Sequence, residues 1–240
     1  MTVRFLPAGD TALVVEFGDR IDRVLNDRVI RLSQRIAAAA LPGVIETVPT
    51  FRSLMVHYDP LSTGAESLAQ AIGGLIRPGA ARAGKRRLWR LPACYDPSLA
   101  PDIEEVAAHV GLTVEDVIAR HADTLFHVYM IGFTPGYPYM GDLPGELHLP
   151  RRKDPRTRVR AGSIAIAAGL TAVYPSESPG GWHLIGATPA RLFDPAWEQP
   201  SLLAPGDAVR FNPVRIDEFA LLAADAAAGR AVAAFEEVAE

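Results

Sequence analysis

The N-terminal third of the chain alternates twice between strand-like and helix-like spacing of its apolar residues. Apolar runs at 3–6 and 12–17 are separated by a short Pro/Gly stretch, which predicts a β-hairpin. Apolar residues then recur at helical spacing: Ile21, Val24, Leu25, Leu32 and Ile36. A second strand pair within 44–58 and a second helix at 65–76 repeat the order. We therefore expect an α+β N-terminal domain over residues 1–78, a ββαββα sandwich with its helices on one sheet face.

After this domain the pattern changes to a basic stretch and then to short β-type runs. Residues 77–90 hold six basic residues and no acid, and we assign 79–90 to a basic interdomain linker. From residue 125 on, strand-like runs are repeatedly broken by Gly and Pro. This spacing predicts a mainly-β domain over 91–240, built as a closed or nearly closed barrel. The alanine-rich tail at 216–240 has the spacing of a helix.

Two short helices are expected between the linker and the barrel strands. Asp102 and Thr113 stand where helix N-caps are typical, with Glu105 and Asp116 three residues after them. Gly111 separates the two helices.

Composition and charge narrow the classes of function. The formal net charge is −4, so nothing in the overall charge draws the protein toward nucleic acid. The single cysteine, Cys94, cannot form an internal disulfide, which is typical of a reducing compartment. We see neither a signal peptide nor an apolar run of the roughly 20 residues that span a bilayer, and we expect a cytoplasmic protein.

Two common kinds of site are not expected. Residues 79–86 approach the phosphate-loop pattern, but Arg86 stands where Ser or Thr should bind magnesium, and no strand is expected before it. The six histidines are scattered without metal-ligand spacing, so we expect no metal site.

The segment 131–141, IGFTPGYPYMG, is the first candidate for chemistry. Glycine allows the backbone to approach a ligand closely, proline stiffens the loop, and the aromatic rings can form a ligand wall with phenol groups. A rigid loop that merely fills one end of the barrel explains the same composition equally well. The candidate ligand-binding residues are Phe133, Pro135, Gly136, Tyr137 and Tyr139.

The segment 149–163, LPRRKDPRTRVRAGS, concentrates positive charge. Guanidinium groups bind carboxylate and phosphate in a bidentate manner, so a face of arginines favours an anion site. A solvated edge strand whose charges prevent sheet-to-sheet association is the alternative. We assign a binding role to Arg151 or Arg156 and an edge role to Arg160.

The segment 174–186, YPSESPGGWHLIG, offers backbone amides and one histidine. The amides of Gly180 and Gly181 can hold an anion, and His183 can transfer a proton near neutral pH. A tight turn beside a packed Trp182 accounts for the pattern equally well.

Taken together, these segments resemble successive motifs of the 5-oxoprolinase B-subunit family, also known as the sporulation kinase A inhibitor or allophanate hydrolase subunit 1 family. The resemblance continues through LLAPGDAVRFNP at 202–213 and, near the N-terminus, through GDTALVVEFG and PTFRSLMVHYDP. It covers nearly the whole chain. It implies a small α/β domain followed by a cyclophilin-like β-barrel.

The resemblance also implies an activity, partners and site residues. The activity is the ATP-dependent opening of 5-oxo-L-proline to L-glutamate, with A and C partner subunits and with ATP and Mg at a site shared with a partner. The candidate catalytic residues are His183, Tyr174 and His127. To the binding residues named above it adds Thr171, Ser178, Gly180, Gly181 and Trp182.

Two positions depart from the family pattern. Leu170 and His183 each replace a glutamine of the family, which puts the identity of the substrate in doubt. The alternatives are an inhibitor of a sensor histidine kinase and a carboxyltransferase-like or allophanate hydrolase-type amide hydrolase component.

Overall fold

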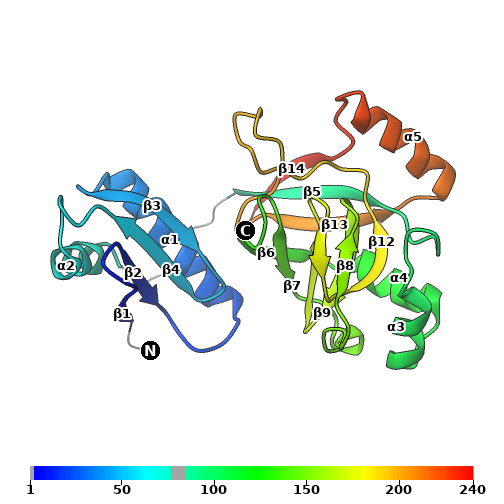
Figure 1. Ribbon diagram of the computed structural model, residues 1–240, viewed down its shortest axis with the longest axis horizontal. Coiled ribbons are helices and arrows are strands. Elements are labelled where there is room, and N and C mark those ends of the chain that lie inside the picture. The colour runs from blue at the N-terminus through cyan, green and yellow to red at the C-terminus, as the bar shows by residue number, and fades with distance from the viewer. Residues whose placement is uncertain (1–2, 77–84, 240) are drawn as a thin grey trace. The chain divides into compact units, whose positions relative to one another are not determined.

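The computed structural model describes residues 3–76 and 85–239 and divides into two compact units, Met1–Ala83 and Gly84–Glu240 (Figure 1). Each unit has its own buried core, and each is described by itself below.

The first unit is a four-stranded antiparallel sheet with two helices. Its elements in chain order are β1 (Arg4–Pro7), β2 (Ala12–Glu16), α1 (Arg23–Ala39), β3 (Val44–Pro49), β4 (Ser53–Tyr58) and α2 (Ala65–Leu75). The sheet order is β1-β2-β4-β3. Alternate residues of the two central strands face the helices, because side chains of a strand point to opposite faces in turn. The resulting core contains Leu13, Val15, Leu25, Val29, Leu32, Ile36, Leu54, Val56, Leu68 and Ile72.

Two residues expected on the buried face of α1 are exposed. The helix begins only at Arg23, after Asp22, whose side chain accepts a hydrogen bond from the Leu25 amide at 3.0 Å. Ile21 therefore precedes the helix, and Val24 in its first turn is 68% exposed. From Leu25 onward, the apolar residues at helical spacing lie on the buried face of α1, as predicted.

The second unit is built mainly from strands, with three α-helices among its described residues. Its elements are β5 (Lys85–Ala93), α3 (Ile103–Val110), α4 (Val114–Asp123), β6 (Phe126–Ile131), β7 (Pro138–Gly141), the 3-10 helix η1 (Gly145–Leu147), β8 (Arg156–Val159), β9 (Ser163–Ala167), β10 (Leu170–Val173), β11 (Ser178–Gly180), β12 (His183–Ala187), β13 (Ala208–Pro213), α5 (Ile216–Ala227) and β14 (Ala234–Ala239). Eight strands form one sheet in the order β12-β9-β10-β7-β6-β13-β5-β14, and β8 and β11 form a separate pair.

The large sheet is curled but does not close into a barrel, so the closed form of the expected closed or nearly closed barrel is wrong. Its outermost strands are β12 and β14. At one end, Cys94 just after β5 exchanges two backbone hydrogen bonds with Ala187 of β12, at 2.8 and 2.9 Å. This isolated bridge brings the two sides of the sheet together at one point only, and β14 occupies the rest of the same edge of β5.

Three further expectations about this unit need correction. Residues 79–84 of the expected linker lie outside the described residues, whereas 85–90 form the first part of β5. The tail is helical only to Ala227, and 234–239 form β14, a strand that pairs with β5. Thr113 does cap α4, but Asp102 makes no side-chain cap bond to α3.

Candidate functional site

Aromatic side chains from two of the three predicted segments pack together in the second unit. Tyr137 is central: its ring centroid lies 5.3 Å from that of Phe133, 5.0 Å from Tyr139, 5.2 Å from Tyr174 and 6.3 Å from Trp182. Most of these contacts are edge-to-face, the arrangement that aromatic pairs prefer. We call these five residues the aromatic cluster. It joins the loop between β6 and β7 to the segment between β10 and β12.

The loop between β6 and β7 owes its shape to Pro135 and Gly136. The Tyr137 amide donates to the Thr134 carbonyl at 3.0 Å, and Gly136 has φ 78°, as a type II turn with Pro at its second position requires. A Cβ on Gly136 would also lie 2.7 Å from Cβ of Phe193. Both residues therefore shape and pack the loop that carries the aromatic rings. Phe133 at the tip is 64% exposed and has a φ of 68°, which is uncommon for a bulky residue.

The tyrosines of the cluster remain protonated near neutral pH. Burial raises the pKa of Tyr137, Tyr139 and Tyr174. The hydroxyl groups of Tyr137 and Tyr174 are hydrogen-bonded to each other. A Cβ on Gly180 would overlap the Tyr174 hydroxyl, so glycine at 180 lets the backbone approach this group closely. The cluster thus presents hydrogen-bond donors, and its phenols do not act as bases at this pH.

Arg151 brings positive charge to the aromatic cluster. Its guanidinium carbon lies 5.9 Å from the centroid of Trp182, within the range of a cation–π contact. Its charge counteracts the effect of burial on the pKa of Tyr137, Tyr139 and Tyr174. Arg151 forms no ion pair with any described residue, so its charge is available to a ligand.

Arg156 is not available in the same way. Its Nη2 donates to Oδ1 of Asp102 at 2.5 Å, and Nη1 of Arg152 reaches the same oxygen at 3.2 Å. Asp102 is 2% exposed, and its Oδ2 accepts from the Leu184 amide at 2.7 Å. Arg156 thus forms an ion pair within the protein, and its anion-binding role stays a prediction. Asp102 was visible in the sequence but was interpreted as a helix cap.

A pocket of about 260 Å³ lies beside the basic segment. Its lining residues are Glu105, His109, Leu149, Pro150, Arg151, Arg152, Lys153, Asp154 and His183. His183 is 7% exposed, and its Nε2 lies 3.0 Å from the Pro150 carbonyl, so this nitrogen carries the proton and donates. Its Nδ1 is buried without a hydrogen-bond partner. His109 and Lys153 of this pocket were not predicted as site residues: His109 belongs to no recognisable motif, and Lys153 was not singled out from the basic segment 149–163.

The other predicted residues are spread over the unit. Ser178 lies in β11, which pairs with β8, and Gly181 accepts a hydrogen bond from the Arg152 amide at 2.8 Å. His127 is buried in β6 with its ring centroid 4.7 Å from that of Tyr129. Thr171 is fully buried, and its hydroxyl is hydrogen-bonded within the core.

That core network centres on His121, which the sequence did not single out. Tyr95 Oη lies 2.9 Å from Nδ1 of His121, and Nε2 of His121 lies 3.0 Å from Thr171 Oγ1. The Thr171 hydroxyl donates to the Ala165 carbonyl at 3.1 Å. The donors therefore run in one direction, from Tyr95 through a neutral His121 to Ala165. Burial lowers the pKa of His121 to about 3, so the ring stays uncharged at neutral pH.

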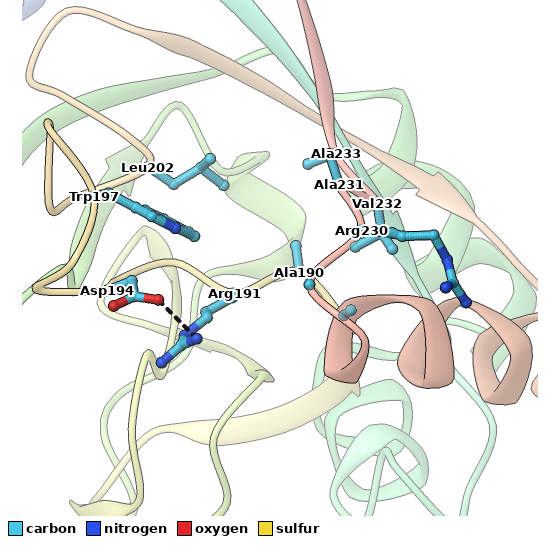
Figure 2. A pocket seen from close by; sticks show the side chains of 11 residues that line it. Ala190, Arg191, Asp194, Trp197, Leu202, Arg230, Ala231, Val232 and Ala233 are labelled. Atoms are coloured by element: carbon cyan, nitrogen blue, oxygen red, sulfur yellow. Dashed lines mark ion pairs between the residues drawn. The ribbon is translucent and has the colours of Figure 1, made fainter.

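A second pocket, of about 310 Å³, lies between the loop that contains Trp197 and the segment before β14 (Figure 2). Its walls are mostly apolar. Arg191 at its rim pairs with Asp194 at 2.7 Å, and Arg230 pairs with Asp225. The charges around this pocket are thus balanced within the protein, unlike that of Arg151.

Within residues 3–76 and 85–239, no group of three or more His, Cys, Asp and Glu side chains is placed to hold a metal ion. None of the helices described here is both long and apolar enough to cross a membrane.

Comparisons with known proteins agree with the geometry. The family model of the carboxyltransferase domain, subdomain C and D, matches residues 3–203. The chain is 41% identical over 209 residues to the B subunit of 5-oxoprolinase from Escherichia coli O157:H7, covering 85% of this chain and 93% of that protein. It is 38% identical over 231 residues to the B subunit of 5-oxoprolinase from Bacillus subtilis (strain 168), covering 91% and 95%.

Solved structures show the same fold. The crystal structure of TTHA0988 superposes with a TM-score of 0.76 at 35% identity, over 89% of this chain and 40% of that longer chain. The Kluyveromyces lactis urea amidolyase superposes with a TM-score of 0.80 at 22% identity, over 99% of this chain and 16% of its own, which is evidence for the fold alone. The chain therefore belongs to the carboxyltransferase subdomain C and D family, and within it to the group of 5-oxoprolinase B subunits.

Proposed function

We propose that this chain is the B subunit of an ATP-dependent 5-oxoprolinase, which opens 5-oxo-L-proline to L-glutamate together with A and C partner subunits in the cytoplasm. The observation that carries the proposal is the identity of 41% and 38% to two proteins of that name, over more than nine-tenths of their lengths. The finer assignment of the second unit to a cyclophilin-like fold belongs to the same proposal. It is supported by the curled sheet, whose two sides meet at the Cys94–Ala187 bridge.

In this proposal the aromatic cluster and Arg151 hold the substrate. The substrate has a carboxylate and a lactam, and a guanidinium without a counter-charge is suited to the carboxylate. The raised pKa of Tyr139 and Tyr174 keeps their hydroxyls as donors, which suits the lactam oxygen as negative charge develops on it. Phe133, exposed at the loop tip, closes over the ring of the substrate.

The remaining candidates take supporting roles. The proton on Nε2 of His183 is committed to the Pro150 carbonyl, which favours an orienting role over proton transfer. His127 and Thr171 are buried within the sheet, and we assign them to packing of the strands that carry the aromatic residues.

We propose that this chain does not bind ATP and magnesium alone. Among the described residues, no group of three or more His, Cys, Asp and Glu side chains is placed to hold a metal ion. We therefore propose that Mg-ATP binds wholly or largely on a partner protein of the complex, and we assign no step of its chemistry to residues of this chain.

The test is glutamate formation from 5-oxoproline by this protein mixed with its A and C partners, with and without ATP. We expect turnover only with ATP and all three chains. Replacing Arg151 with Gln should lower kcat/KM at least about 30-fold, since a charged hydrogen bond to substrate contributes roughly 2 kcal/mol or more. Arg158→Gln is the matched control, because Arg158 is an exposed arginine of the same segment that pairs with Glu177 at 2.7 Å.

The other outcomes separate the alternatives. If the assembled complex hydrolyses urea or allophanate but not 5-oxoproline, the proposed substrate is wrong and one of these compounds takes its place. A chain that fails to assemble with the partners but inhibits a sensor histidine kinase would replace the enzyme proposal altogether.

A further inference from the structure

We propose that Asp102 is a positioning residue, whose buried carboxylate ties the basic segment 151–156 to the start of β12 and so keeps Arg151 over Trp182. Its effect on turnover rests on the proposed function, whereas its effect on geometry does not.

Asp102 joins three parts of the second unit. It stands at the start of α3, and its Oδ1 accepts from Arg156 Nη2 at 2.5 Å and Arg152 Nη1 at 3.2 Å. Its Oδ2 accepts from the Leu184 amide at 2.7 Å, and its own amide donates to the Leu184 carbonyl at 3.1 Å. A side chain that is 2% exposed thus receives three hydrogen bonds from outside its own helix.

These bonds lie close in the chain to both Arg151 and Trp182. Arg152 is the next residue, and its amide also donates to the Gly181 carbonyl at 2.8 Å. Gly181 and Leu184 flank Trp182, the ring over which the Arg151 guanidinium lies. Asp102 therefore holds both halves of the Arg151–Trp182 contact without touching either.

The alternative role, a helix cap, does not match the observed bonds. The carboxylate makes no side-chain bond to the first amides of α3. Its charge instead pairs with two guanidiniums that are each about a quarter exposed, at 24% and 26%, and that of Arg152 also pairs with Glu105 at 3.0 Å. Nε of Arg152 and Nη1 of Arg156 are buried without partners, so this ion cluster lacks the full set of hydrogen bonds that a purely stabilising cluster is expected to have.

The first experiment measures the Trp182 environment directly in the full chain. The protein is labelled with 5-fluorotryptophan, and the fluorine resonance of Trp182 is assigned with Trp182→Phe. We expect Asp102→Asn and Arg151→Gln each to shift this resonance while those of Trp89 and Trp197 stay in place. Glu104→Gln, an exposed acid of α3 two residues after Asp102, is the control and should leave all three unchanged.

The second experiment measures kinetics of the assembled complex with 5-oxoproline. Asp102→Asn should lower kcat/KM about 10-fold or more, mainly through KM, because substrate loses a preoriented guanidinium. The same change made on an Arg151→Gln background should have almost no further effect, since both act through one contact. Glu104→Gln should stay within about twofold of the unchanged protein.

Clear results would overturn the proposal. An unshifted Trp182 resonance in Asp102→Asn, or equal shifts of all three tryptophans, would leave Asp102 as a general packing residue. Additive kinetic effects of Asp102→Asn and Arg151→Gln would do the same. If Asp102→Asn does not fold, Arg152→Gln removes one of the ties and should show the same Trp182 shift and the same non-additivity, in weaker form. A wild-type complex without 5-oxoprolinase activity would refute the proposed function, and the fluorine spectra alone would then decide the role of Asp102.

Discussion

The second unit contains two buried polar networks that differ in charge and in completeness. In the network of Tyr95, His121 and Thr171, every polar hydrogen has an acceptor and no member is charged. In the network of Asp102, Glu105, Arg152 and Arg156, four charges meet and two guanidinium nitrogens remain buried without partners.

This difference separates a network that stabilises the fold from one that serves a site. Neutral and fully hydrogen-bonded networks contribute to stability and to a unique core, whereas buried ion clusters are weak evidence for stability. The neutral network lies between sheet and helix, stacked on Phe211 with ring centroids 4.8 Å apart. The charged network lies beside the pocket and next to Arg151. We infer that mutations in the neutral network change mainly the stability, whereas mutations in the charged network change mainly the activity.

The largest expected effect is on stability, from His121→Ala. The change leaves two buried hydroxyls without one partner each and opens a cavity, and together these cost about 3 kcal/mol in the free energy of unfolding. Denaturant unfolding of the purified chain measures it. His109→Ala, at an exposed position of α3, is the control and should change the free energy by less than about 0.5 kcal/mol. Equal effects of the two substitutions would contradict the distinction between the networks.

The pH dependence of stability is the next largest effect. Burial lowers the pKa of His121 to about 3 in the folded protein from 6.5. The unfolded chain therefore binds a proton here that the folded protein does not, between pH 6.5 and about 3. The stabilisation is complete above pH 6.5 and falls by about 1.4 kcal/mol per pH unit below it. Unfolding curves at about pH 7, 6 and 5 give the free energy of unfolding as a function of pH. This free energy should change less with pH in His121→Gln than in the unchanged protein. The same pH dependence in both would mean that His121 is not buried as a neutral ring.

A smaller effect is expected on activity, from Gly180→Ala. The new methyl group would overlap the Tyr174 hydroxyl and displace it, so kcat/KM of the assembled complex should fall about tenfold. Gly181→Ala is the matched control, because a Cβ there meets Pro155 at 3.5 Å, an ordinary contact. Loss of activity in both variants alike would assign the effect to the chain segment and not to Tyr174.

The smallest effect is expected from His183→Gln. The glutamine amide can still donate to the Pro150 carbonyl, which is the one hydrogen bond that His183 makes among the described residues. We expect kcat within about threefold of the unchanged protein, with the pH profile of kcat preserved. A loss of about 100-fold would give His183 a chemical role that its committed Nε2 does not suggest.

Sequence patterns predicted the elements well where apolar periodicity is strong. Both strand pairs and both helices of the first unit follow from alternation and helical spacing. The prediction that Val24 is buried was wrong, because the helix begins only at Arg23 and its first turn is not covered. The strand Ala234–Ala239 was missed, because it follows an alanine-rich helix and its register depends on pairing with Lys85–Arg90 far away in the chain.

The site was predictable in its segments but not in its pairings. Aromatic and basic segments were recognised from composition, and the cluster around Tyr137 brings residues of two of them together. Which arginine remains unpaired could not be read from the sequence, since it depends on Asp102, about 50 residues away from both Arg152 and Arg156. Long-range charge pairing leaves no periodic signal along a chain.

One edge of β5 is paired with β14 along most of its length and meets β12 at a single point, which has a consequence for self-association. β14 covers Lys85–Arg90 on that edge, and β12 reaches it only at Cys94. If β14 were displaced, a row of unpaired backbone groups six residues long would be open to any extended chain that could add to it. β14 is itself an outermost strand, so it replaces the free edge of β5 by its own, and it would be the element to move if a partner docked by strand addition on β5.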